Sequence, residues 1–171
     1  MSYFVRKGKY SSSDMRFILI DEILEMTPGQ TIRGIKAIDG NEDYFPDHFP
    51  GFPVVPGVIL TEMMAQTAGK CLDAENPQRG KSMLAQITDA RFREWVRPGQ
   101  LATIHARIIS SRPTFATAKC RIEVGQRDVC SAELLFSFLK VDELLPGYRD
   151  EVLERFLNRP VKTPTAIGTI P

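Results

Sequence analysis

The chain places one of its two histidines and a glutamate in its most proline-dense apolar segment, DHFPGFPVVPGVILTEMMAQ, residues 47–66. A neutral imidazole can take a proton from the carbon beside a carbonyl group near pH 7, so His48 is a candidate base. A carboxyl can donate a proton at this pH only where burial raises its pKa, and Glu62 stands among apolar residues. The pair is therefore a candidate base that removes a proton and a candidate acid that expels a hydroxyl from the neighbouring carbon.

Two neighbours of this pair extend the predicted site. The proline-rich run ends at Pro56, and a helix can begin at Gly57. The first free N–H groups of this helix would stabilise negative charge on a carbonyl oxygen. Gln66 lies four residues after Glu62 on the same helix face, where it either orients the acid, reaches a partner helix or satisfies backbone groups in the core. The competing interpretation makes His48 a loop histidine bonded to a backbone carbonyl and Glu62 a partly exposed helix residue.

The sequence of residues 41–66 resembles the signature of the β-hydroxyacyl-[acyl-carrier-protein] dehydratases, the FabZ-like branch of the hotdog superfamily. That signature reads approximately NEPFF, then GHFP, a short spacer, PGVL, and E followed by AMAQ. The spacing from His48 to Glu62 matches, and the resemblance extends over roughly residues 16–140. The matching residues are Asn41, Glu42, Phe45, His48, Phe49, Pro50, Pro56, Gly57, Val58, Glu62, Met64, Ala65 and Gln66.

This resemblance implies an α+β hotdog fold, with a curled antiparallel sheet wrapped around a long central helix. It implies a cofactor-free and metal-free lyase that converts (3R)-3-hydroxyacyl-[acyl-carrier-protein] to the trans-2-enoyl product in fatty acid, lipid or polyketide biosynthesis. The basic unit would be a homodimer, in some members a trimer of dimers, with the histidine of one subunit facing the glutamate of the other. The implied roles are base for His48, acid for Glu62, carbonyl clamp for Gly57, and substrate binding for Val58, Gln66, Phe49 and Pro50.

Two other functions stay open. Asp47 stands where the family usually has glycine, which keeps open a non-catalytic subunit that binds acyl thioesters. Hydrolysis of acyl thioesters on the same fold is the other alternative. Arg91, Arg93 and Arg97 would either attract an acidic acyl carrier protein and its phosphopantetheine phosphate or form a solvated basic face.

Composition narrows the setting. The formal net charge is +1, from 22 Lys and Arg against 21 Asp and Glu, so nothing favours nucleic acid or an anionic membrane as partner. No apolar segment approaches the length of a membrane span, and we expect a soluble cytoplasmic protein. Cys71, Cys120 and Cys130 are widely spaced, which predicts reduced, buried thiols. His105 has no acidic neighbour in sequence, and we expect no chemical role for it.

The element pattern is one domain, residues 16–140, between a polar leader, 1–15, and a C-terminal helix and tail, 141–171. Apolar runs on either side of TPGQ predict a first hairpin, and the four prolines that follow predict a stiff loop. A helix from Gly57 should end at Gly69 and the ENPQRG segment. The later alternating segments predict four more strands, at residues 82–96, 101–109, 114–124 and 128–140.

Overall fold

The computed structural model describes residues 17–140, 146, 147, 149, 151 and 154. The predicted C-terminal helix and most of both tails lie outside these residues. The described elements are β1 (Glu22–Thr27), β2 (Thr31–Ala37), α1 (Gly57–Glu75), the short 3₁₀ helix η1 (Pro77–Arg79), β3 (Lys81–Phe92), β4 (Leu101–Ser111), β5 (Phe115–Val124) and β6 (Arg127–Leu139).

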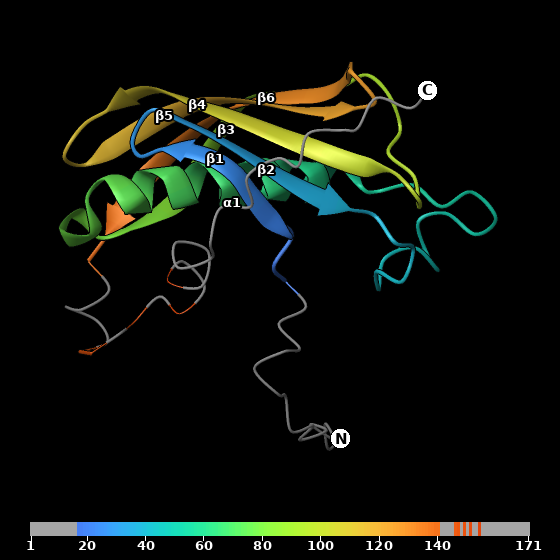
Figure 1. The fold of residues 1–171 in the computed structure, drawn as a ribbon, viewed down its shortest axis with the longest axis horizontal. Helices are drawn as coiled ribbons and strands as arrows, with labels where there is room; N and C mark the ends of the chain where they lie inside the picture. Colours follow the sequence, from blue (N-terminus) through green and yellow to red (C-terminus); the bar gives the residue numbers. More distant parts are fainter. Residues whose placement is uncertain (1–16, 141–145, 148, 150, 152–153, 155–171) are drawn as a thin grey trace, which may run out of the picture.

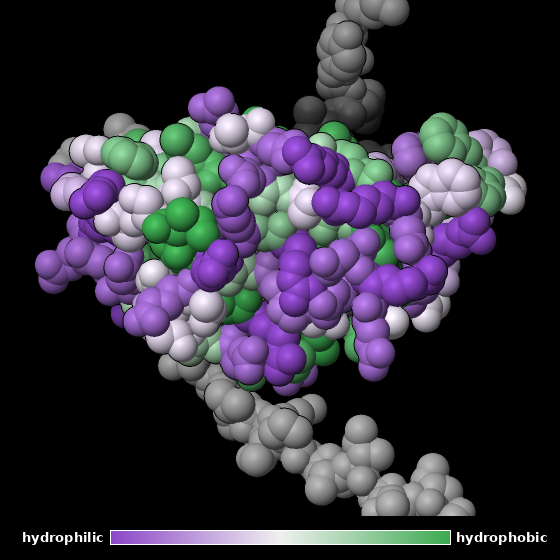
Figure 2. Space-filling model, turned by 90° about the horizontal axis from the view of Figure 1, so that it is seen from above, coloured by the Kyte–Doolittle hydropathy of each residue, from purple (hydrophilic) through white to green (hydrophobic). Residues whose placement is uncertain are grey.

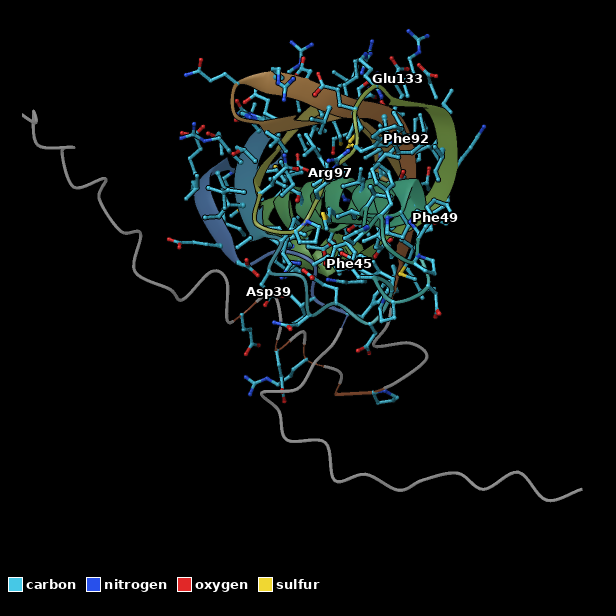
Figure 3. The ribbon with its side chains drawn as sticks, turned by 90° about the vertical axis from the view of Figure 1, so that its right-hand side faces the viewer. Asp39, Phe45, Phe49, Phe92, Arg97 and Glu133 are labelled. Atoms are coloured by element: carbon cyan, nitrogen blue, oxygen red, sulfur yellow. The ribbon has the colours of Figure 1, made fainter. Side chains whose placement is uncertain are left out.

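The six strands form one antiparallel sheet in the order β1-β2-β4-β5-β6-β3, so β1 and β3 are its two edges. The sheet lies over one face of α1 and curls around it, which is clear when the molecule is viewed toward the start of the helix (Figures 1 and 3). This is the predicted hotdog arrangement.

Turn chemistry explains the two tight hairpins. Gly29 takes a φ of 68° in the Pro-Gly turn between β1 and β2. Gly125 and Gln126 both have positive φ between β5 and β6, as a two-residue turn of type I′ requires. Each turn therefore sets the register of the strands on either side of it.

The helix is the centre of the core. Met63, Met64 and Leu72 are fully buried, and the inward side chains of β4, β5 and β6 pack around them. The predicted helix end in the ENPQRG segment is confirmed, because α1 ends at Glu75, whereas Gly69, the other predicted end, lies within the helix. Glycine is needed at position 69 for a different reason: a Cβ there would lie 3.0 Å from the Ser82 hydroxyl of β3, which donates to the Gly69 carbonyl at 3.2 Å.

Strand β3 is shorter than predicted and unusually exposed. It ends at Phe92, because the backbone N–H groups of Arg93 and Glu94 both turn to the Val129 carbonyl, at 2.8 and 3.2 Å. None of its twelve residues is buried in the described protomer. Four apolar side chains on it are 38–50% exposed: Met83, Leu84, Ile87 and Phe92. An apolar sheet edge of this kind is typical of an interface.

The outer face of the sheet is polar, as Figure 2 shows from above. Lys119 pairs there with Glu133 at 2.8 Å, the latter labelled on this face in Figure 3. His105 does have an acidic partner, since antiparallel pairing with β5 brings Glu123 within 2.9 Å of its Nε2. A hydrogen bond from Arg121 to Glu123 holds the pKa of that carboxyl below its usual value.

The three cysteines are free and buried, as predicted. Burial raises the pKa of Cys120 and of Cys130 to about 12 in each case. Thiols in this state are packing groups rather than nucleophiles.

Candidate active site

The loop before α1 holds His48 by three bonds. Its backbone N–H donates to the Tyr44 carbonyl at 3.0 Å, its carbonyl accepts from the Val54 N–H at 3.1 Å, and its ring Nδ1 lies 3.1 Å from the Val54 carbonyl. A carbonyl oxygen can only accept, so in this arrangement Nδ1 carries the hydrogen. The neutral ring then has its lone pair on Nε2, the state that a general base needs.

The residues around His48 are open to solvent. The Phe49 ring stacks on the imidazole with centroids 4.2 Å apart, and both Phe49 and Pro50 are exposed. Reciprocal backbone bonds between Phe49 and Phe52, at 3.1 and 2.9 Å, close the turn. In the described part of the chain Gln126 is the only non-glycine residue with positive φ. Asp47 therefore does not take the positive φ that would favour glycine at this position.

The helix begins beside this loop. The Val55 N–H bonds to the Val96 carbonyl at 2.8 Å, and α1 follows at Gly57 without a side-chain cap. Its first N–H groups, those of Gly57 and Val58, have no partner within the helix. A Cβ on Gly57 would lie 3.1 Å from the Phe92 ring, so this glycine leaves room for the aromatic ring of β3 that Figure 3 labels near the helix start.

Glu62 is half-buried and held by Gln66. The amide Nε2 of Gln66 donates to the Glu62 carboxylate at 3.1 Å and to the Phe17 carbonyl at 3.0 Å, while its Oε1 accepts from the Leu19 N–H at 3.0 Å. Both interpretations of Gln66 within one protomer therefore hold. It orients the predicted acid and also satisfies the backbone of residues 17–19.

Glu62 lies in an open cleft of about 470 Å³. The floor is the face of α1 that carries Glu62 and Gln66, and residues 17–18 and the start of β3 form its sides. His48 is not part of the lining of this cleft.

The three arginines predicted to bind the carrier protein contact different parts of the molecule. Arg91 pairs with Asp89 at 3.0 Å, and Arg93 donates to the Ser131 hydroxyl at 3.0 Å in a groove on the outer sheet face. Arg97 lies over the Phe52 ring, 4.7 Å from its centroid, and thus beside the His48 loop. Only Arg97 is therefore in contact with the loop that holds the predicted base.

Within the described residues, no group of three His, Cys, Asp or Glu side chains is arranged to hold a metal ion. The described helix is not apolar enough over a sufficient length to cross a membrane.

The hotdog fold carries a helix start with free N–H groups, a carboxylate held by a hydrogen bond, and a histidine whose Nε2 is free to accept a proton. Together these features define a class of protein that acts on acyl groups. The family profile described as FabA-like domain matches residues 12–133, and the chain belongs to this family. It is 36% identical over 127 residues to the 3-hydroxyacyl-[acyl-carrier-protein] dehydratase FabZ of Levilactobacillus brevis, covering 74% of this chain and 86% of that protein. The FabZ of Desulforamulus reducens is 39% identical over 122 residues, with 71% and 86% covered.

Solved structures show the same fold at low sequence identity. The dehydratase heterocomplex ApeI:P of Xenorhabdus doucetiae has a chain with a TM-score of 0.54 at 17% identity, covering 66% of this chain and 92% of that one. A hypothetical thioesterase of Streptococcus pneumoniae, solved with coenzyme A, gives 0.57 at 13% identity, with 70% and 85% covered. These comparisons confirm the predicted FabZ-like resemblance and the hotdog fold.

Sequence reasoning missed one feature at the helix start and one in the cleft. Phe92 was not singled out, because its contact with Gly57 depends on where β3 runs. Lys70 and Asp73 also line the cleft, and their spacing from Glu62 on the helix was the available signal.

Proposed function

We propose that the protein is a (3R)-3-hydroxyacyl-[acyl-carrier-protein] dehydratase in which His48 is the base and Glu62 the acid. The observation that carries this assignment is the Gln66 bond that fixes the Glu62 carboxylate in an open cleft of a FabZ-like chain. In this reaction Nε2 of His48 takes the proton from the carbon beside the thioester carbonyl. Glu62, protonated, gives its proton to the hydroxyl on the next carbon, which leaves as water while the double bond forms.

The carbonyl oxygen gains negative charge as the proton leaves. The N–H groups of Gly57 and Val58 are free donors at the positive end of α1, and they would bind this oxygen. Val58 is 74% exposed, so a substrate reaches this end of the helix from outside the protomer. Phe49 and Pro50 would line the entrance.

The proposal includes a homodimer. His48 does not line the cleft of Glu62 in the described protomer, and β3 leaves an apolar edge uncovered. A second copy that covers β3 would bury this edge and bring its own His48 toward Glu62. Arg97, beside the loop, is the arginine best placed to meet an acidic acyl carrier protein.

Activity is measured on the purified full-length protein with crotonyl and longer enoyl chains on acyl carrier protein. We expect loss of the enoyl absorbance without release of thiol, and a loss of at least a hundredfold in His48→Ala and Glu62→Gln. His105→Ala and Glu133→Gln, on the outer face, are matched controls that should keep full activity. Release of thiol would indicate a hydrolase, and carrier binding without turnover a non-catalytic subunit; either result would refute the assignment.

Mixing the two inactive variants tests the shared site. If each site takes its histidine from one copy and its glutamate from the other, half of randomly mixed dimers carry one intact site out of two, so about a quarter of the activity returns. If the two residues act within one copy, no activity returns after co-expression, and the proposed dimeric site is wrong.

A further inference from the structure

The cleft that holds Glu62 changes character along its length. Glu62, Gln66, Gly69 and Asp73 follow one another at spacings of three or four residues, so they lie on one face of α1. At about 1.5 Å per residue, Lys70 is about 12 Å and Asp73 about 16 Å beyond Glu62 along the helix axis. The cleft thus runs from the proposed acid to a pair of charged side chains.

Its far end is built from three charged groups. Asp73 is only 4% exposed; its Oδ1 accepts from the Ser82 N–H at 2.8 Å and its Oδ2 pairs with the Lys81 ammonium at 2.5 Å. Lys70, one turn before Asp73, is 8% exposed and lines the same cleft. Here the cleft therefore presents two ammonium groups and one carboxylate.

The cleft is also narrow just before this end. The helix and β3 approach closely at Gly69, where the Ser82 hydroxyl would lie 3.0 Å from a Cβ. Nearer Glu62 the lining is apolar, with Ile18, Ala65 and Leu84 among its residues. An acyl chain bound with its hydroxyl at Glu62 would extend along this apolar part toward Lys70.

We propose that Lys70, Asp73 and Lys81 close the acyl-binding cleft with charge, so that the protein selects short acyl chains over long saturated ones. This inference rests on the proposed dehydratase function. A saturated tail that passes Gly69 would displace water from charged groups and return no hydrogen bond, which is unfavourable. A tail that ends within about 12 Å of the reacting carbon meets only apolar lining.

The test compares kcat/KM for a series of enoyl chains on acyl carrier protein, from crotonyl to hexadecenoyl. The wild type should lose roughly tenfold or more once the tail extends beyond about 12 Å. Lys70→Met keeps the length of the side chain and removes its charge, so the ratio of kcat/KM on long chains to kcat/KM on crotonyl should rise roughly tenfold. Lys119→Met, a matched change in an ion pair of the outer face, should leave the whole profile unchanged.

A second variant keeps the inference testable if Lys70→Met does not fold. Asp73→Asn with Lys81→Met neutralises the ion pair as a unit and should shift the profile in the same direction. Equal turnover of long and short chains by the wild type would overturn the inference and leave the dehydratase assignment intact. An unchanged profile in both folded variants would do the same. Absence of turnover with every chain would refute the proposed function, and this inference with it.

Discussion

Gln66→Leu is the substitution that best separates folding from chemistry. The change removes an amide that bonds to the Phe17 carbonyl, the Leu19 N–H and the Glu62 carboxylate. Leu19 is 6% exposed, and a buried N–H left without a partner costs about 1–3 kcal/mol. With the smaller loss at the half-exposed groups, we expect the free energy of unfolding to fall by about 2–3 kcal/mol.

For a chain of this size that loss lowers Tm by roughly 4–12 °C. The measurement is a thermal melt followed by circular dichroism, at one fixed protein concentration because an oligomer melts at a temperature that depends on it. Gln78→Leu, at an exposed glutamine of η1, is the matched control and should melt with the wild type. A melt of Gln66→Leu within about 1 °C of wild type would refute this account of the Gln66 bonds.

The same variant tests the orientation of the acid. In the proposed reaction Glu62 acts in its neutral form, and a hydrogen bond between neutral groups contributes about 0.5–1.5 kcal/mol, so its loss should lower kcat by roughly twofold to tenfold at a temperature where the variant is folded. KM should change much less, because Gln66 acts through Glu62. A variant with full kcat would show that Gln66 supports residues 17–19 and does not position Glu62.

Two further substitutions test other contacts. Gly57→Ala places a methyl group 3.1 Å from the Phe92 ring and beside the free N–H. Because the ring is half-exposed and can move, Tm should shift by less than about 3 °C, while kcat/KM falls at least about tenfold. An undiminished kcat/KM would contradict the carbonyl-clamp role of Gly57. Glu123→Gln should reduce the loss of stability at acid pH. The Arg121 hydrogen bond lowers the pKa of Glu123 in the folded protein, so the stability that Glu123 contributes is present above its unfolded-state pKa and disappears as pH falls through its folded-state pKa. Urea titrations between about pH 5 and pH 3 should therefore show the wild type losing more stability than the variant, and parallel losses would contradict this.

Local signals predicted most of the fold. The Pro-Gly turn, the proline-rich loop and the alternating apolar runs gave the correct number and order of strands, because turn geometry and side-chain periodicity act over a few residues. Gly69 misled the prediction of the helix end, since its role depends on the approach of Ser82 from a strand that comes later in the chain. His105 gained Glu123 as a partner for the same reason: strand register decides the pair.

The same distinction between local signals and long-range packing applies to the candidate site. The spacing of His48 and Glu62 pointed to acid and base chemistry, and their local supports, Val54 and Gln66, lie within a few residues of them. The contact of Phe92 with Gly57 and the ion pair between Asp73 and Lys81 each join residues that only the packing of β3 on α1 brings together.

The exposure of β3 also bears on how the family can diversify. The strand is held to β6 through its backbone, and its large apolar side chains are not part of the core of the described protomer. Ile87 is thus largely released from the requirement that the chain fold, whereas Met83 and Leu84 also line the Glu62 cleft. Selection on Ile87 acts through whatever surface covers it, so after a gene duplication a change at this position could separate self-association from pairing with a sister chain while both copies kept the same fold and the same cleft.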